Sequence, residues 1–211
     1  MLPTKPTLSQ RWFHFIFPCG RKKLENAVQQ RKRQLLANLS GTVLEIGPGT
    51  GANLKYLPAD VHFIGVEPNP LMIESLRKEA ASLSREIVIF EGRADALPAK
   101  DASVDAVIST LVLCSVPSAD AAIREAARVL KPGGTFIFIE HVAAPRGSGY
   151  RIFQKLVRPL WKWMNDHCDP LRETGDSIRA AGFVNITYDE FRTGYPVVSP
   201  HIGGTAQKRE R

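Results

Sequence analysis

Three glycines follow an apolar segment in the sequence VLEIGPGTG (residues 43–51). Glycine lets a backbone turn sharply and approach a bound ligand closely, because it carries no side chain. Glu67 lies 20 residues after Gly47, at the end of the next apolar run. This interval fits one helix plus one strand of a βαβ unit, which returns the carboxylate to the sheet edge where the glycines lie. There it can accept hydrogen bonds from both hydroxyls of a ribose, so the pattern predicts a nucleoside-binding α/β domain.

The glycine segment alone leaves two ligands open. Gly47, Gly49 and Ala52 also satisfy the dinucleotide fingerprint Gly-x-Gly-x-x-Gly/Ala, so NAD and S-adenosylmethionine (SAM) both fit it. Asp95 follows the third apolar run, residues 87–90. An acidic side chain at that place can accept a hydrogen bond from an adenine amino group.

Hydrophobic periodicity and turn residues predict an alternation of strands and helices. Strands are expected over 42–46, 61–66, 87–90, 103–109 and 135–141, followed by an antiparallel pair over 183–191 and 201–207. Helices are expected over 21–38, 52–56, 70–83, 118–130, 150–164 and 171–181. Glu67, Asp95, Thr110 and His141 fall at or just beyond strand ends. Ligands of open α/β sheets bind at the carboxyl ends of strands, so these residues are candidates for one site.

In this order, the motifs resemble the class I SAM-dependent methyltransferases over about residues 43–208. The resemblance rests on the glycine segment, Glu67, EGRADALP (91–98), the strand over 103–109 and RVLKPGG (128–134). It implies one α/β domain with a doubly wound, mostly parallel, seven-stranded Rossmann-like sheet of order 3-2-1-4-5-7-6. It also implies SAM as the cofactor, bound by Glu45, Gly47, Gly49, Gly51, Asn53, Glu67, Pro68, Asp95, Ala96, Thr110 and Leu111.

Four further segments resemble the alkyl thiol S-methyltransferases, a microsomal methyltransferase-like group. They are TLVLCSV (110–116), EHVAA (140–144), DHCDPLRET (166–174) and PHI (200–202). That group carries a long apolar N-terminal anchor, which is not expected here, and its usual Asp-Gly-Cys stands here as Asp-His-Cys. The resemblance implies methyl transfer to a small lipophilic acceptor, a thiol first, with a quinone or phenol ring as the alternative.

Such a transfer needs an electron-rich acceptor held in line behind an already activated sulfonium methyl group. A thiol, with an ordinary pKa of about 8.5, becomes that acceptor when it loses its proton. His141 is the first candidate for the base, and His167 with Asp166 is the second. The alternative is structural, with His141 bonded to a backbone group in the core and the segment 166–172 joining two helices.

The cysteines suggest structural roles and a reducing compartment. Methyl transfer needs no covalent intermediate, so Cys114 and Cys168 are expected to be buried structural residues. The spacing of His167, Cys168 and His201 matches no zinc pattern, so no metal site is expected. Three cysteines without a Cys-x-x-Cys pair favour a cytoplasmic protein.

Positive charge is concentrated in the first 40 residues, which contain eight Lys and Arg against one Glu. The rest of the chain, residues 41–211, is neutral and is expected to form the methyltransferase domain. The arm also contains WFHFIF (12–17). Aromatic rings beside cations suit peripheral contact with an anionic membrane, whereas the alternative is a lid over the acceptor pocket with a solvated basic face. Nucleic acid is not an expected partner because no base-reading module is recognisable.

Two functions of other classes stay open from the sequence. An NAD-dependent oxidoreductase has support only from the glycine segment. A noncatalytic SAM-binding protein would keep the cofactor residues without the acceptor chemistry. The sequence does not indicate an oligomeric state.

Overall fold

The computed structural model describes residues 8–210, with side chains at Arg11 and from Lys23 onwards. The helices are α1 (Leu8–Leu36), a short 3₁₀ helix η1 (Leu54–Tyr56), α2 (Pro70–Ser82), α3 (Ala119–Val129), α4 (Gly149–Met164) and α5 (Thr174–Ala180). The strands are β1 (Thr42–Ile46), β2 (His62–Glu67), β3 (Ile87–Glu91), β4 (Val104–Thr110), β5 (Leu130–His141), β6 (Val184–Arg192) and β7 (Pro200–Gln207).

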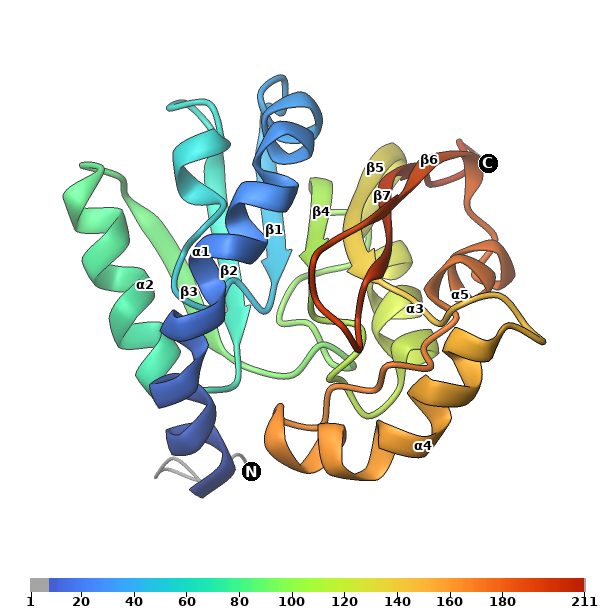
Figure 1. The fold of residues 1–211 in the computed structure, drawn as a ribbon. Helices are drawn as coiled ribbons and strands as arrows, with labels where there is room; N and C mark the ends of the chain where they lie inside the picture. The colour runs from blue at the N-terminus through green and yellow to red at the C-terminus, as the bar shows by residue number, and fades with distance from the viewer. Residues whose placement is uncertain (1–7, 211) are drawn as a thin grey trace.

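The seven strands form one sheet of order β3-β2-β1-β4-β5-β7-β6. β1 pairs in parallel with β2 and β4, while β7 lies antiparallel between β5 and β6. The sheet is therefore mixed, and the predicted order is confirmed. The parallel strands point downward in Figure 1, so their carboxyl ends meet at the lower edge of the sheet.

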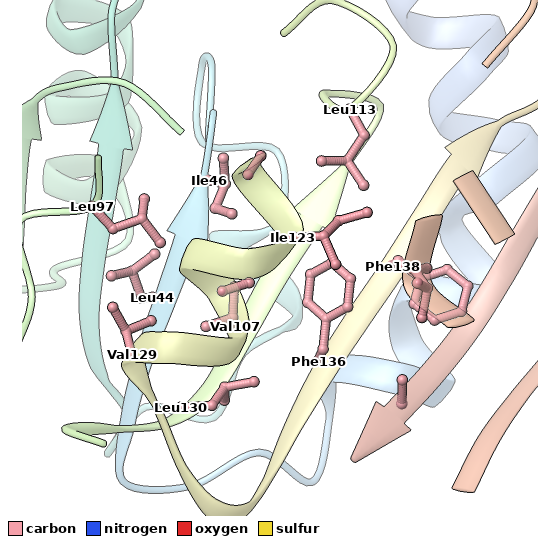
Figure 2. Packing of buried hydrophobic residues seen from close by; sticks show 14 of the residues in the cluster. Leu44, Ile46, Leu97, Val107, Leu113, Ile123, Val129, Leu130, Phe136 and Phe138 are labelled. Atoms are coloured by element: carbon pink, nitrogen blue, oxygen red, sulfur yellow. The ribbon is translucent and has the colours of Figure 1, made fainter. Parts of the chain in front are cut away.

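Helices cover both faces of the sheet, and alternate strand residues point to one face or the other. Leu44 and Phe136 pack with Ile123 of α3 and Ile178 of α5 on one face. On the other face, the buried set includes Leu36 of α1 and Leu76 of α2, with Val43, Phe63, Ile108 and Ile137 from the strands. Figure 2 shows α3 lying across β1, β4 and β5. Its apolar side chains are directed into the cluster that contains Leu44 and Phe136.

The N-terminal helix is longer than expected, since α1 begins at Leu8 rather than near residue 21. Its second half packs against the domain, where Val28 is buried and Lys32 pairs with Glu25 at 2.7 Å. Arg31 bonds Asp189 of β6 and stacks over Phe191. The second half of the basic arm is therefore packed into the fold through Val28 and Arg31, while Lys23 and Arg33 are exposed. The aromatic segment 12–17 has a helical backbone, but its side chains lie outside the described residues.

Three further expected boundaries were wrong. The helix expected over 52–56 is one 3₁₀ turn, and the helix expected over 171–181 covers only Thr174–Ala180. β5 begins at Leu130 rather than at residue 135. The Pro-Gly-Gly segment joins the sheet because Gly133 and Gly134 exchange backbone hydrogen bonds with Lys208, which the local sequence does not reveal.

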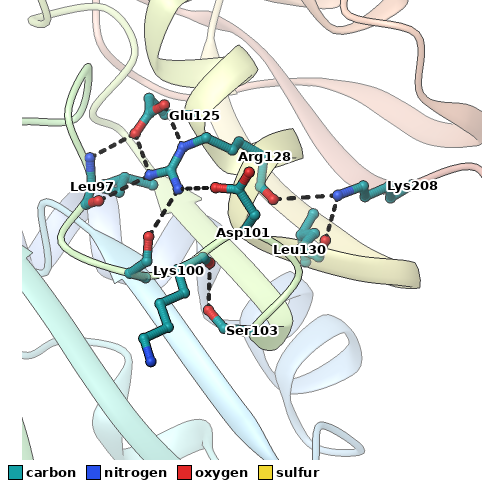
Figure 3. Close-up of polar contacts among 9 residues, drawn as sticks. Leu97, Lys100, Asp101, Ser103, Glu125, Arg128, Leu130 and Lys208 are labelled. Atoms are coloured by element: carbon teal, nitrogen blue, oxygen red, sulfur yellow. Dashed lines mark hydrogen bonds and ion pairs between the residues drawn. The ribbon is translucent and has the colours of Figure 1, made fainter.

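Arg128 at the end of α3 fixes the loop that follows β3. Its guanidinium donates to the carboxylates of Glu125 and Asp101 and to the carbonyl oxygens of Leu97 and Ala99 (Figure 3). The loop that carries Asp95 is thereby held against α3.

Helix α4 contacts the domain through its polar side. Buried Gln154 accepts from Ala144 N and donates to Val197 O, and Arg158 pairs with Asp169. The apolar side faces solvent, where Ile152, Leu156, Leu160 and Trp163 are 57%, 76%, 61% and 79% exposed. None of the helices in the described part of the chain combines the length and apolar character needed to cross a bilayer.

Candidate active site

The glycine segment forms an open backbone turn at the carboxyl end of β1. Gly47 and Gly49 have φ values of +59° and +56°, in the left-handed region that favours glycine. A Cβ at Gly47 would lie 2.7 Å from Val112, whereas one at Gly49 would meet no atom within 4 Å. The backbone at Gly49 is therefore accessible to a ligand, as a cofactor cradle requires.

Glu67 is buried directly beside this turn at the end of β2. Its two carboxylate oxygens accept hydrogen bonds from Gly49 N and Asn69 N, each at 3.0 Å. Burial raises the pKa of Glu67 to about 7, although both backbone hydrogen bonds act in the opposite direction. The sequence-based pairing of Glu67 with the glycine segment is thus present as a direct contact.

A second buried carboxylate lies under the same turn. Glu45 accepts a 2.7 Å hydrogen bond from Asn53 Nδ2, which also donates to Thr110 Oγ1 at 3.0 Å. Burial raises the pKa of Glu45 to about 7. Buried oxygens of Glu45, Thr50 and Asn53 have no partner among the described atoms.

These groups fit SAM, which offers an ammonium group and two ribose hydroxyls as donors. The unpartnered oxygens around Glu45 suit the ammonium group, and Glu67 suits the hydroxyls. Five of the predicted cofactor residues make hydrogen bonds in two groups, Gly49 with Glu67, and Asn53 with Glu45 and Thr110. Gly47 and Gly51 belong to the same turn.

His141, at the end of β5, is buried against two cysteines. Its Nε2 lies 3.1 Å from Cys168 Sγ, and Trp161 Nε1 donates to the same sulfur at 3.2 Å. Cys114, from the loop after β4, completes the group. The raised pKa of the Cys114 thiol follows from its contact with Cys168 and from burial.

The two candidate bases occupy different environments. His141 is 3% exposed, whereas His167 is exposed to solvent. Asp166 and His167 both have positive φ, +44° and +63°, in the turn after α4. The negative charge of Asp166 raises the pKa of Glu67, so this turn lies near the cofactor edge.

Comparison with known proteins identifies the family. The family model described as "Methyltransferase domain" matches residues 44–138. Human thiol S-methyltransferase TMT1A is 33% identical over 95% of this chain and 88% of its own length, and mouse TMT1B is 38% identical with the same coverage. This chain belongs to the thiol S-methyltransferase family.

Solved structures agree with this fold. A Thermotoga maritima protein described as a possible histamine N-methyltransferase has a TM-score of 0.68 at 24% identity, covering 95% of this chain and 100% of its own. The [4+2]-cyclase SpnF has a TM-score of 0.73 at 20% identity, covering 99% and 98%. At this identity the likeness shows the fold alone, and SpnF illustrates that the fold also carries other chemistry.

This methyltransferase uses SAM as its cofactor, as the family and fold together establish. The two carboxylate oxygens of Asp95 accept hydrogen bonds from the Arg93 guanidinium at 2.8 and 2.7 Å. This contact lowers the pKa of Asp95. The adenine contact predicted for Asp95 stays a prediction. Ala96 and Pro68 are exposed on neighbouring loops, and Leu111 adopts φ +59° directly after β4.

Sequence reasoning missed Glu140 and the grouping of the cysteines in this methyltransferase. Glu140 is fully buried and accepts from Ser109 Oγ at 2.6 Å and from Val112 N at 3.1 Å. It therefore holds the loop after β4, which carries Cys114. An acidic residue at the end of an apolar strand was the available signal for Glu140. No spacing signal pairs Cys114 with His141 and Cys168.

Proposed function

We propose that this protein transfers the methyl group of SAM to a small lipophilic thiol. The observation that carries the proposal is the extent of the similarity. Thiol S-methyltransferases match 95% of the chain at 33% identity or more, including the segments that follow β5. Quinone-biosynthesis C-methyltransferases match less of it, 76% for a Nitrobacter protein at 27% identity and 56% for a Caulobacter protein at 33% identity. The segments after β5 bring His141, Trp161 and Cys168 together, so the longer match includes the acceptor side.

The bound cofactor supplies an activated methyl group, and the chain positions the reactants. Glu67 and the glycine turn hold the ribose, and Glu45 receives the ammonium end. The thiol must approach from the side of β4 and β5, since that side of the carboxyl edge carries the buried sulfur and imidazole groups. His141 and His167, the latter beside Asp166, are the two candidates to take the thiol proton.

Turnover with a mixed panel tests the acceptor class. The purified chain is incubated with SAM and equal concentrations of alkyl thiols, phenols and quinones, and products are identified by mass spectrometry. Methyl thioethers should form together with equimolar S-adenosylhomocysteine. Methylated phenol or quinone in their place would favour the alternative, for which the distant quinone-biosynthesis relatives are the support. SAM binding without any product would favour a noncatalytic role, and calorimetry with NADH should show no binding.

We also propose that the protein contacts anionic membrane surfaces through two elements. The first is the basic aromatic arm, and the second is the exposed apolar side of α4, which the sequence did not single out. The amino-terminal end of α1 and the whole of α4 lie at the same lower edge of the molecule (Figure 1). A cavity of about 380 Å³ at the start of α4 is lined by Arg146, Arg151 and Lys155 among others. Both arginines pair with Glu173, and the excess of cations over this one carboxylate suits lipid phosphate.

Vesicle flotation tests this localisation. The full chain should float with anionic vesicles and be released by added salt, because screening weakens the attraction of cations to lipid. Deletion of residues 1–20, or serine at Leu156, Leu160 and Trp163 together, should each reduce flotation. Val88→Ser is the control, because Val88 is also an exposed apolar residue, at 51%, and lies on the edge strand β3. Equal flotation of all variants would instead favour the arm as a lid, in which case its deletion should change acceptor affinity.

A further inference from the structure

Two cysteines and a histidine from three distant segments share one buried position at the carboxyl edge of the sheet. Cys114 follows β4, His141 ends β5 and Cys168 follows α4. Their Sγ, Nε2 and Sγ atoms all lie within 4.8 Å of one another, and the His141 to Cys168 pair is 3.1 Å apart. Neither cysteine is in a disulfide.

This spacing suits a soft metal ion. Zinc binds sulfur at about 2.3 Å and imidazole nitrogen at about 2.0 Å, which separates tetrahedral ligand atoms by about 3.6 to 3.8 Å. The printed 3.1 Å separation lies below this range and the other separations stay within 4.8 Å, so adjustments of about 1 Å would place all three atoms on one ion. Two thiolates and one imidazole are also a ligand set that selects zinc over magnesium or calcium.

The surroundings hold the ligand atoms in place. Indole N–H groups only donate, so Trp161 Nε1 at 3.2 Å treats Cys168 Sγ as an acceptor, as it would a metal-bound thiolate. Asp169 N donates to the carbonyl oxygen of Cys114 at 2.9 Å, which fastens the two cysteine loops together. Cys114 and His141 are each 3% exposed. Cys168 is half-buried. The cluster is thus largely shielded from water, and hydrogen bonds fix the two cysteine loops.

We propose that Cys114, His141 and Cys168 bind one Zn²⁺ ion whose fourth position receives the acceptor thiol. The proposal rests on the proposed thiol methylation and assigns it a means of activating the acceptor. Three protein ligands with one open position are the usual arrangement of catalytic zinc sites. His141 then acts as a ligand rather than as the base.

The chemistry balances without a further reactant. The acceptor thiol loses its proton to solvent when its sulfur binds the ion. That sulfur then forms a bond to the methyl carbon as the bond between this carbon and the sulfonium sulfur breaks. The products are the methyl thioether and S-adenosylhomocysteine, and the neutral thioether, a weaker ligand than a thiolate, leaves the ion.

Metal binding is measured first, without reference to activity. Protein without an affinity tag is stripped with a chelator and titrated with Zn²⁺ against a chromophoric competitor, and then loaded with Co²⁺. One equivalent should bind, and the Co²⁺ form should show thiolate charge-transfer absorption and the visible bands of a tetrahedral site. Addition of an alkyl thiol should shift those bands.

Variants locate the site. Cys168→Ser and His141→Gln should remove the high-affinity equivalent. Trp161→Phe keeps all three ligands and should weaken zinc binding by about 10- to 100-fold, since outer partners of metal ligands have effects of that size. His62→Gln is the matched control, because His62 is exposed at the start of β2 and should leave zinc binding unchanged.

The results of these experiments distinguish failure of the zinc site from failure of the proposed thiol methylation. Absence of stoichiometric zinc binding to the wild type, or equal binding by Cys168→Ser, overturns the zinc site. Full thiol methylation by the stripped protein also overturns it while leaving thiol methylation intact. A third outcome is that Cys168→Ser removes stoichiometric zinc binding but the wild type methylates phenols and not thiols. That result overturns the thiol as acceptor and its role as the fourth zinc ligand, while the zinc site itself stands. Loss of thiol turnover on stripping and its return with Zn²⁺ supports the proposal.

Discussion

Two groups of residues at the carboxyl edge of the sheet are held in different ways: the cofactor edge, around Gly49 and Glu67, and the proposed acceptor edge, around His141 and Cys168. Among the cofactor residues, Gly49 and Glu67 are 18 residues apart, and Gly49 N donates a hydrogen bond to the Glu67 carboxylate. At the acceptor edge, Cys168 lies 27 residues from His141, and side chains make the contacts. The first region follows from local motifs and strand register, whereas the second depends on how α4 and its loop are placed. Cofactor affinity and acceptor chemistry should therefore respond to separate substitutions.

Helices α3 and α4 share an amphipathic sequence pattern but differ in whether their apolar side is buried. Both carry apolar residues at helical spacing. In α3 these residues, among them Ala122 and Ile123, are buried against the sheet, whereas in α4 they face solvent. An amphipathic pattern thus predicts a helix without predicting what covers its apolar side.

The largest effect on the cofactor edge is expected from Gly49→Val. A β-branched residue at φ +56° is strained and would occupy the space next to the backbone, so SAM affinity should fall by more than about 100-fold, or about 2.7 kcal/mol. Gly182→Val is the control, since Gly182 also has positive φ and open space. Calorimetry should show normal SAM binding for the control only, and equal losses in both variants would assign the effect to stability.

The buried carboxylates predict a pH dependence of stability without ligand. Burial raises the pKa of Glu45 from 4.5 to about 7, so folding becomes less favourable as pH rises from about 4.5 to 7. Glu45→Gln should remove this loss and should be more stable than the wild type at pH 8 by up to about 3 kcal/mol, with little difference near pH 4.5. Urea unfolding of both proteins at several pH values measures this difference in the free energy of unfolding. Parallel pH profiles for both proteins would contradict the burial of an ionisable Glu45.

Glu67→Ala should weaken SAM binding by about 1.5 to 3 kcal/mol, the range for hydrogen bonds to a charged group. Glu91→Ala is the matched control, because Glu91 is the register partner of Glu67 on β3 and is exposed. Turnover at saturating SAM should change much less than affinity. If the SAM affinities of both variants equal that of the wild type, Glu67 does not hold the ribose.

Asp169→Asn, at the acceptor edge, should have a smaller effect, and it should change thiol turnover rather than SAM affinity. The Asp169 carboxylate accepts from Arg158 and from Leu171 N, which fixes the loop that carries Cys168. Its loss should lower kcat/KM for a thiol about tenfold, or about 1.4 kcal/mol, with SAM affinity unchanged. Asp60→Asn, at an exposed position in the loop before β2, should alter neither quantity. A parallel loss of SAM affinity in Asp169→Asn would show that the two edges are not separable.

The sequence by itself determined the cofactor half of this methyltransferase. Apolar runs bounded by turn residues located all seven strands, and the family resemblance implied their order, which the structure confirms. Gly47, Gly49 and Glu67 could be recognised because a glycine turn and a strand-end carboxylate one βαβ unit later are close in sequence and fixed by parallel register.

Tertiary structure alone decided the acceptor half. Cys114, His141 and Cys168 meet because β5 lies beside β4 and the loop after α4 folds back onto both, and no periodicity encodes that return. The burial of Glu140 and the exposed apolar side of α4 were equally hidden. Local sequence specifies which side of a helix or strand is apolar, but contacts between distant segments depend on how the whole chain packs.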